Sequence, residues 1–244
     1  MHKYTNVRLT LLIVIASCVP AHAQITTVGS WNIAEVHSAC IPIEESDLDA
    51  ESRECTVAEF DKVVTIDKQT FYYALYRDFL PQDRQPEKET HSNVAVIFRG
   101  SIGSGEVTVF HVRNHLRRWF YSYDLPRLLD SDRGPVLHLP GSGLGDSRLQ
   151  FSYDEYWLWR DDTWVQLDVW GWTNSWLDEY LPAGLNLDGI HKSDFNLPSM
   201  QYSGMVRRSD DCHTCATGGS ATISFEWDDL VLKIRNVEYF PSTK

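Results

Sequence analysis

Short runs rich in aromatic and β-branched residues alternate with clusters of Gly, Pro, Asp and Ser along most of this chain. Runs of this kind are typical of β-strands, and the clusters between them are typical of turns. We expect strands at 31–37, 62–67, 70–76, 94–98, 106–112, 117–123, 135–139, 148–159, 164–170, 221–227 and 230–239. The sequence therefore predicts a mainly β fold, organised as an antiparallel β-sandwich or barrel.

One short helix is expected at 176–181. Ser175, with Asp178 three residues later, is typical of the start of a helix, and Pro182 would end it.

The clearest local structure is a hairpin around Asp161 and Asp162. If these two residues form the turn, strand alternation fixes which residues face one another. The expected cross-strand pairs on one face are Trp159 with Trp164, Trp157 with Gln166, Glu155 with Asp168, and Tyr153 with Trp170. The opposite face is apolar and carries Tyr156, Leu158, Val165 and Leu167.

The tryptophan-bearing face of this hairpin is the candidate ligand-binding surface. Four indoles lie on it, those of Trp157, Trp159, Trp164 and Trp170. Flat indoles can stack on sugar rings, and Glu155 opposite Asp168 would place together the two carboxyl groups that a glycosidase needs. Like charges directly opposite are destabilising, so the register is open at that pair. Three interpretations remain: burial of both faces in a core, glycan binding, and catalysis by the two acids.

The N-terminal segment 1–23 is predicted to be a cleavable secretory signal. His2, Lys3 and Arg8 precede an apolar run at 9–19, and Ala21-His22-Ala23 ends it with small residues. The run is shorter than the roughly 20 apolar residues that a membrane-spanning helix needs, so no transmembrane span is expected. A second interpretation is open, because 15–18 resembles a lipobox that would lipidate Cys18.

The predicted mature chain, 24–244, is long enough for a single β-rich domain. Two polar segments, 41–54 and 81–92, are expected to form loops, the first of them acidic. Without Lys3 and Arg8 the chain has 20 basic and 34 acidic residues, a net charge of −14. Such a surface repels nucleic acid and favours a cationic partner, for example a hydrolase that the protein inhibits.

The four cysteines that follow the predicted signal are Cys40, Cys55, Cys212 and Cys215. Four cysteines allow three pairings, and the short loops favour Cys40 with Cys55 and Cys212 with Cys215. The Cys212–Cys215 spacing also occurs in redox motifs and zinc sites. However, Gly218 and Gly219 lead into a strand instead of a helix, and the spacing of Cys40 and Cys55 is too wide for zinc. We therefore expect structural disulfides formed in an oxidising, periplasmic or secreted location, or on a protein anchored by lipid at Cys18.

No pattern in the sequence predicts a metal site or a cofactor. His111 and His115 lack the Glu of a zinc-protease helix, and on a strand they would lie too far apart to share an ion. The glycine-rich segment 141–145 is followed by Asp146 and by no helix pattern that could hold a phosphate.

The segment 135–235 resembles an uncharacterised group of secreted bacterial proteins. The shared features are Pro135-Val136-Leu137 with a glycine-rich turn, the tryptophan hairpin, Leu181-Pro182-x-Gly184, and a cysteine pair before Gly218-Gly219. The cysteines are adjacent in that group and separated by two residues in this chain. The resemblance implies export and a β-fold, and it implies no activity.

Together these features predict an exported, non-enzymatic protein that binds another molecule, such as a glycan or a cationic protein. The alternatives are a carbohydrate-active enzyme that uses Glu155 and Asp168, and an inhibitor of a cationic hydrolase.

Overall fold

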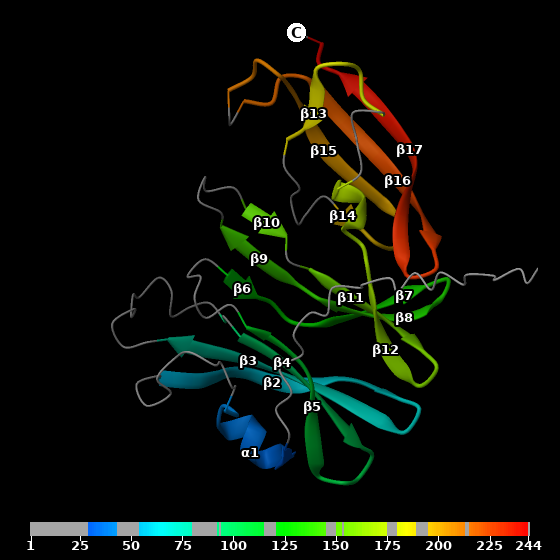
Figure 1. Cartoon of the computed structure of the whole chain (residues 1–244). Coiled ribbons are helices and arrows are strands. Elements are labelled where there is room, and N and C mark those ends of the chain that lie inside the picture. Colours follow the sequence, from blue (N-terminus) through cyan, green and yellow to red (C-terminus); the bar gives the residue numbers. More distant parts are fainter. Residues whose placement is uncertain are drawn as a thin grey trace, which may run out of the picture.

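The computed structural model describes 29–42, 54–79, 92, 94–114, 121–144, 150–152, 154–174, 180–188, 195–212 and 215–243. In these ranges antiparallel β-sheets dominate, which confirms the expected mainly β fold. Three sheets lie one above another, as Figure 1 shows. We call them the N-terminal, middle and C-terminal sheets.

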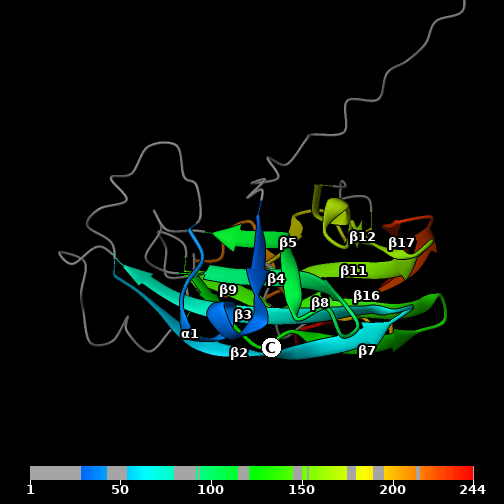
Figure 2. The ribbon, with the colours of Figure 1, turned by 90° about the horizontal axis from the view of Figure 1, so that it is seen from below.

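The N-terminal sheet has the strand order β1-β5-β4-β3-β2. Its strands are β1 (Ser30–Asn32), β2 (Glu54–Ile66), β3 (Gln69–Phe79), β4 (Val94–Ser101) and β5 (Glu106–Asn114). Helix α1 (Ile33–Ser38) covers the face of this sheet that points away from the other layers (Figure 2). Val36 of α1 is fully buried there, in a cluster with Tyr76 and Phe98.

The middle sheet has the order β12-β11-β8-β7. Its strands are β7 (Arg127–Ser131), β8 (Gly134–Leu139), β11 (Glu155–Arg160) and β12 (Thr163–Leu167). Beside it lies a small sheet of β6 (Tyr121–Tyr123), β9 (Gly141–Leu144) and β10 (Gln150–Ser152). Only Pro140 separates β8 from β9, so the chain passes directly from one sheet into the other.

The C-terminal sheet has the order β13-β15-β16-β17, and β14 also pairs with β15. Its strands are β13 (Leu185–Leu187), β14 (Phe195–Asn196), β15 (Gln201–Arg208), β16 (Gly219–Asp228) and β17 (Val231–Pro241). A short 3-10 helix, η3 (Gly171–Asn174), lies between β12 and this sheet in the chain.

The central strands of the middle sheet, β8 and β11, are buried on both faces, which explains why they are mostly apolar. One face packs against the N-terminal sheet, in a cluster that includes Leu137, Trp157, Trp159, Phe71 and Ile97. The other face packs against the C-terminal sheet, in a cluster that includes Val136, Tyr156, Leu158, Ile223 and Phe225. Strand alternation thus sends neighbouring residues of β8 and β11 into two different cores.

Two-residue turns connect several of the hairpins. Both residues have positive φ in the β2–β3 turn, Asp67 (44°) and Lys68 (69°), and in the β11–β12 turn, Asp161 (50°) and Asp162 (59°). Such turns match the right-handed twist of the strands. The two turns also link the layers: Trp159 Nε1 donates to Asp67 Oδ2 at 2.7 Å, and Gln69 Nε2 donates to the Asp162 carbonyl at 3.2 Å.

The expected strand at 31–37 is wrong beyond Asn32. Asn32 accepts a hydrogen bond from the Ala34 amide at 2.8 Å, and Glu35 accepts one from the Asn32 amide at 3.4 Å. This reciprocal capping box starts α1 within a run of residues that otherwise suits a strand. The expected ranges do not include strands β7, β9, β13, β14 and β15; β15 carries Ser203 and Gly204, which weaken the strand pattern.

Several expectations fall on residues outside the described ranges. These are the signal at 1–23, lipidation of Cys18, most of the loops at 41–54 and 81–92, and most of the helix at 176–181. Tyr180 and Leu181, the described part of that helix, lie in a turn. In the described part of the chain, no helix is long and apolar enough to cross a membrane.

Candidate functional site

The cysteines are paired as the loop lengths favour. Cys40 bonds to Cys55 and Cys212 bonds to Cys215. The first disulfide packs against the apolar cluster under α1, whereas the second lies in the exposed loop between β15 and β16. Disulfides of this kind form in an oxidising extracellular or periplasmic environment.

The hairpin register is confirmed from Tyr156 to Arg160. Trp159 pairs with Trp164 and Trp157 pairs with Gln166. However, the indoles of Trp157, Trp159 and Trp164 are only 8%, 9% and 4% exposed. Trp170 packs on the opposite side of the middle sheet, beside Phe195. These side chains fill two cores between the layers, which agrees with the first of the three interpretations, burial of both faces in a core.

The structure does not bring Glu155 and Asp168 together as a catalytic pair. Strand β12 ends at Leu167, and Glu155 pairs with Leu139 of β8. The Asp168 backbone instead bonds to Leu230 and Leu232, beside β17. The Asp168 carboxylate accepts hydrogen bonds from the amides of Trp170 at 3.1 Å and Gly171 at 2.6 Å. Asp168 thus starts the turn of η3.

Glu155 belongs to an ion-pair cluster between the N-terminal and middle sheets. Its Oε1 lies 3.0 Å from Arg113 Nε and its Oε2 lies 2.8 Å from His111 Nε2. Trp157 Nε1 also donates to Oε2, at 3.3 Å. Burial raises the pKa of Glu155, but the His111 hydrogen bond and the Arg113 charge outweigh it and lower the pKa from 4.5 to about 2.

This cluster positions strands and does not suit a catalytic acid. A general acid must be protonated near neutral pH, whereas Glu155 is ionised and both of its oxygens are bound. The Arg113 side chain is 3% exposed. It also donates to the Leu139 carbonyl at 2.7 Å and lies over the Tyr123 ring at 4.5 Å. It therefore joins β5 to β8 and the small sheet.

Gly141 makes room for this arginine. A Cβ at Gly141 would come within 2.8 Å of Arg113 Nη2 and 3.2 Å of the Tyr123 ring. The first glycine of the glycine-rich segment 141–145 is thus needed because Arg113 and Tyr123 pack against it.

A second contact between a histidine and a carboxyl group lies next to Gly141. His138 Nε2 lies 3.3 Å from Asp154 Oδ2, and Asp154 Oδ1 accepts from the Gly141 amide at 2.8 Å. The His138 ring stacks on Tyr156 at 4.4 Å. Burial, followed by the Asp154 charge, raises the pKa of Tyr156 well above its ordinary value. No group of His, Cys, Asp or Glu among the described residues could hold a metal ion.

The surface of the N-terminal sheet carries an open, polar depression of about 500 Å³, most of whose lining side chains are exposed. Its lining comes from β1, β3, β4, β5 and the β4–β5 turn. The lining residues include Ser30, Gln69, Arg99, Ser101, Glu106 and Thr108. We call this feature the Arg99 cavity.

Strand register explains how these side chains converge. Ser30 pairs with Thr108 and Thr108 pairs with Arg99, so the three residues form one row across the sheet. The next residue in that row, Phe71 of β3, is buried in the core with Trp164. The Arg99 cavity therefore begins where the sheet extends beyond the middle sheet and its apolar core.

The charged groups of the Arg99 cavity differ in their partners. Glu106 Oε2 accepts a hydrogen bond from the Ser30 hydroxyl at 3.1 Å. The Arg99 guanidinium makes no hydrogen bond or ion pair with any residue that the structure describes, and Arg99 is exposed. An exposed guanidinium in a depression that is also lined by hydroxyl groups and a carboxylate can bind an anionic group of a hydroxylated ligand.

Sequence reasoning did not identify the Arg99 cavity or the two contacts between a histidine and a carboxyl group. Arg99 ends an apolar run, and Glu106 and Thr108 alternate with valines, so alternation could have placed the polar residues of each strand on one face. Their convergence depends on pairing between strands that are distant in sequence.

The chain matches no protein-family model, no curated protein and no solved structure in the comparisons made. The resemblance of 135–235 to secreted bacterial proteins stays a prediction.

Proposed function

We propose that this chain is an exported binding protein that holds a small, hydroxylated, negatively charged ligand, such as an acidic sugar, in the Arg99 cavity. The observation that carries the proposal is the exposed guanidinium of Arg99, which has no partner among the described residues and lies in a cavity lined by Ser30, Thr108 and Glu106. Export is supported by the two disulfides and by the signal pattern of 1–23.

The lining of the cavity supports a sugar-like ligand. Hydroxyl and amide groups both donate and accept hydrogen bonds, as the hydroxyl groups of a sugar do. The Arg99 guanidinium can bind a carboxylate with two parallel hydrogen bonds, and Glu106 can accept from a sugar hydroxyl. A ligand with one anionic group is compatible with the net negative charge of the chain, because the Arg99 guanidinium attracts that group locally.

The positions and contacts of three carboxyl groups, those of Glu155, Asp168 and Glu106, support binding without turnover. Glu155 is ionised, and His111 and Arg113 bind its two oxygens. The Asp168 carboxylate accepts a hydrogen bond from the Gly171 amide at the start of η3. Glu106 accepts a hydrogen bond from the Ser30 hydroxyl, and no other described residue that lines the cavity carries a carboxyl group. A glycosidase of the ordinary type needs two carboxyl groups that flank the scissile bond.

Calorimetric titration with a panel of neutral sugars and uronic acids tests the proposal. We expect binding of at least one uronic acid and much weaker binding of the matching neutral sugar. Replacing Arg99→Ala should weaken binding about tenfold or more, which corresponds to about 1.4 kcal/mol or more. Arg99→Lys should retain part of the affinity, because it keeps the charge and loses the bidentate geometry.

The matched control is Arg235→Ala, which removes the same charge from an exposed position on β17 of the C-terminal sheet. It should leave the affinity unchanged. Equal weakening by both substitutions would show that only net charge matters. The absence of binding to every acidic sugar of the panel would contradict the proposed function.

A further inference from the structure

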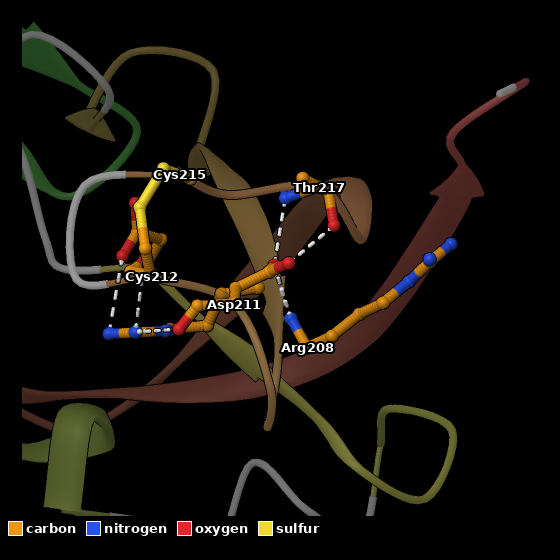
Figure 3. The surroundings of a disulfide bond; sticks show 7 residues. Arg208, Asp211, Cys212, Cys215 and Thr217 are labelled. Atoms are coloured by element: carbon orange, nitrogen blue, oxygen red, sulfur yellow. Dashed lines mark hydrogen bonds and ion pairs between the residues drawn. A yellow bond between two sulfur atoms is a disulfide. The ribbon is translucent and has the colours of Figure 1, made fainter.

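A second feature, independent of the Arg99 cavity, is the disulfide in the loop between β15 and β16. We propose that Cys212–Cys215 is a redox-active disulfide that exchanges with thiols of a partner protein or peptide, while Cys40–Cys55 is structural. Figure 3 shows this loop and the residues that hold it.

The two disulfides differ in their surroundings. Cys212 and Cys215 are both exposed. Cys40 and Cys55 are half-buried and pack with Val57 and Phe60 against the cluster under α1. A thiolate must approach along the axis of the disulfide to attack a sulfur atom, so exposure favours exchange at Cys212–Cys215.

The loop does not depend on its disulfide. The Asp211 carboxylate accepts hydrogen bonds from the Arg208 amide at 2.7 Å, from the Thr217 amide at 2.8 Å and from the Thr217 hydroxyl. Through Asp211 these bonds connect Arg208, the last residue of β15, with Thr217, which precedes β16 (Figure 3). They lower the pKa of Asp211 from 3.8 to about 2, so the carboxylate holds the loop throughout the neutral range. The reduced protein therefore keeps the same framework.

The disulfide also contributes little by loop closure. Its cysteines are 3 positions apart, whereas Cys40 and Cys55 are 15 positions apart. Loop-closure stabilisation grows with the logarithm of loop length, so the shorter loop gains less. Reduction of Cys212–Cys215 should therefore change the stability of the fold only slightly.

Arg207 binds the backbone of the loop beside the disulfide. Arg207 Nη2 donates to the Cys212 carbonyl and to the Asp211 carbonyl, each at 3.3 Å. A second nitrogen of Arg207 lies 3.7 Å from Asp188. The guanidinium thus holds the backbone of the loop at Cys212 and ties it to Asp188.

The exchange proceeds in two steps. A partner thiolate attacks one sulfur of Cys212–Cys215, a mixed disulfide forms, and the other cysteine leaves as a thiolate. A second partner thiolate then attacks the mixed disulfide and releases the second cysteine. The partner dithiol is oxidised to a disulfide by two electrons, and Cys212 and Cys215 are reduced to thiols after protonation.

The test mixes the oxidised protein with a synthetic peptide that contains two cysteines, and follows both by alkylation and mass spectrometry. We expect about one equivalent of peptide disulfide per protein, with Cys212 and Cys215 alkylated and Cys40 and Cys55 protected. The variant Cys212→Ser/Cys215→Ser should keep the native circular dichroism and melting temperature and oxidise no peptide.

Titration with dithiothreitol gives the second measurement. We expect Cys212–Cys215 to be half reduced at a reductant concentration at least about tenfold below that for Cys40–Cys55, with the native spectrum unchanged. Simultaneous reduction of both disulfides with loss of the fold would overturn the proposal, as would unfolding of the double-serine variant. Oxidation of the peptide by the Cys212→Ser/Cys215→Ser variant would also overturn the proposal.

Discussion

At the scale of single residues, the ionised Glu155 makes the stability of this protein depend on pH. The pKa of Glu155 is lowered to about 2 in the folded chain from 4.5. A group with a depressed pKa stabilises the fold above its unfolded pKa and loses that contribution as pH falls through the folded pKa. A shift of this size corresponds to about 3 kcal/mol, lost between about pH 4.5 and pH 2.

We therefore expect Glu155→Gln to lower the free energy of unfolding by about 3 kcal/mol at pH 7, because it also leaves Arg113 buried without its carboxylate partner. The cost should shrink toward pH 2, where about half of the wild-type carboxyl groups are themselves protonated. Urea unfolding at pH 7 and near pH 2 measures both values. An equal cost at the two pH values would contradict the account of this cluster.

At the scale of elements, α1 depends on its cap. The helix is only six residues long and begins where the sequence otherwise suits a strand. Asn32→Ala should remove the hydrogen bond to the Ala34 amide and lower the free energy of unfolding by about 1 kcal/mol. Denaturant titration measures the effect, and Asn32→Asp is the matched control because aspartate caps as well. An unchanged stability in Asn32→Ala would exclude this role.

The elements also show what could be predicted from the sequence. The tryptophan hairpin was predictable pair by pair, because a two-residue turn and strict alternation determine the register. The expected pairing of Glu155 with Asp168 does not form, because β12 ends at Leu167 and the Asp168 backbone bonds to Leu230 and Leu232. Local signals alone could have identified α1, since Asn32 and Glu35 are three residues apart.

At the scale of the whole molecule, the middle sheet holds the layers together. Its side chains alternate between two cores, and these cores could not be assigned from sequence because both faces carry large apolar side chains. The position of the Arg99 cavity follows from the same arrangement, since it lies where the N-terminal sheet continues beyond the core.

Trp159 tests this role of the middle sheet. It packs edge-on against Phe71 and Trp164, and its indole nitrogen bonds to Asp67 of the N-terminal sheet. Trp159→Ala should lower the free energy of unfolding by about 3–5 kcal/mol, because it empties a core between two layers. Thermal or urea unfolding measures the loss. Arg160→Ala, at the exposed neighbouring position, should cost far less; a similar cost for both would argue against layer packing.

The central claim, that the Arg99 cavity binds the negative group of a hydroxylated ligand, is tested most directly by nuclear magnetic resonance. The side-chain Nε–H signal of Arg99 would be followed while glucuronic acid or another bound uronic acid is added, with the Arg235 signal as the internal reference. The account predicts a saturable shift of the Arg99 signal, together with shifts at Ser30, Glu106 and Thr108, and none at Arg235. Shifts that cluster elsewhere, with Arg99 unchanged, would contradict it.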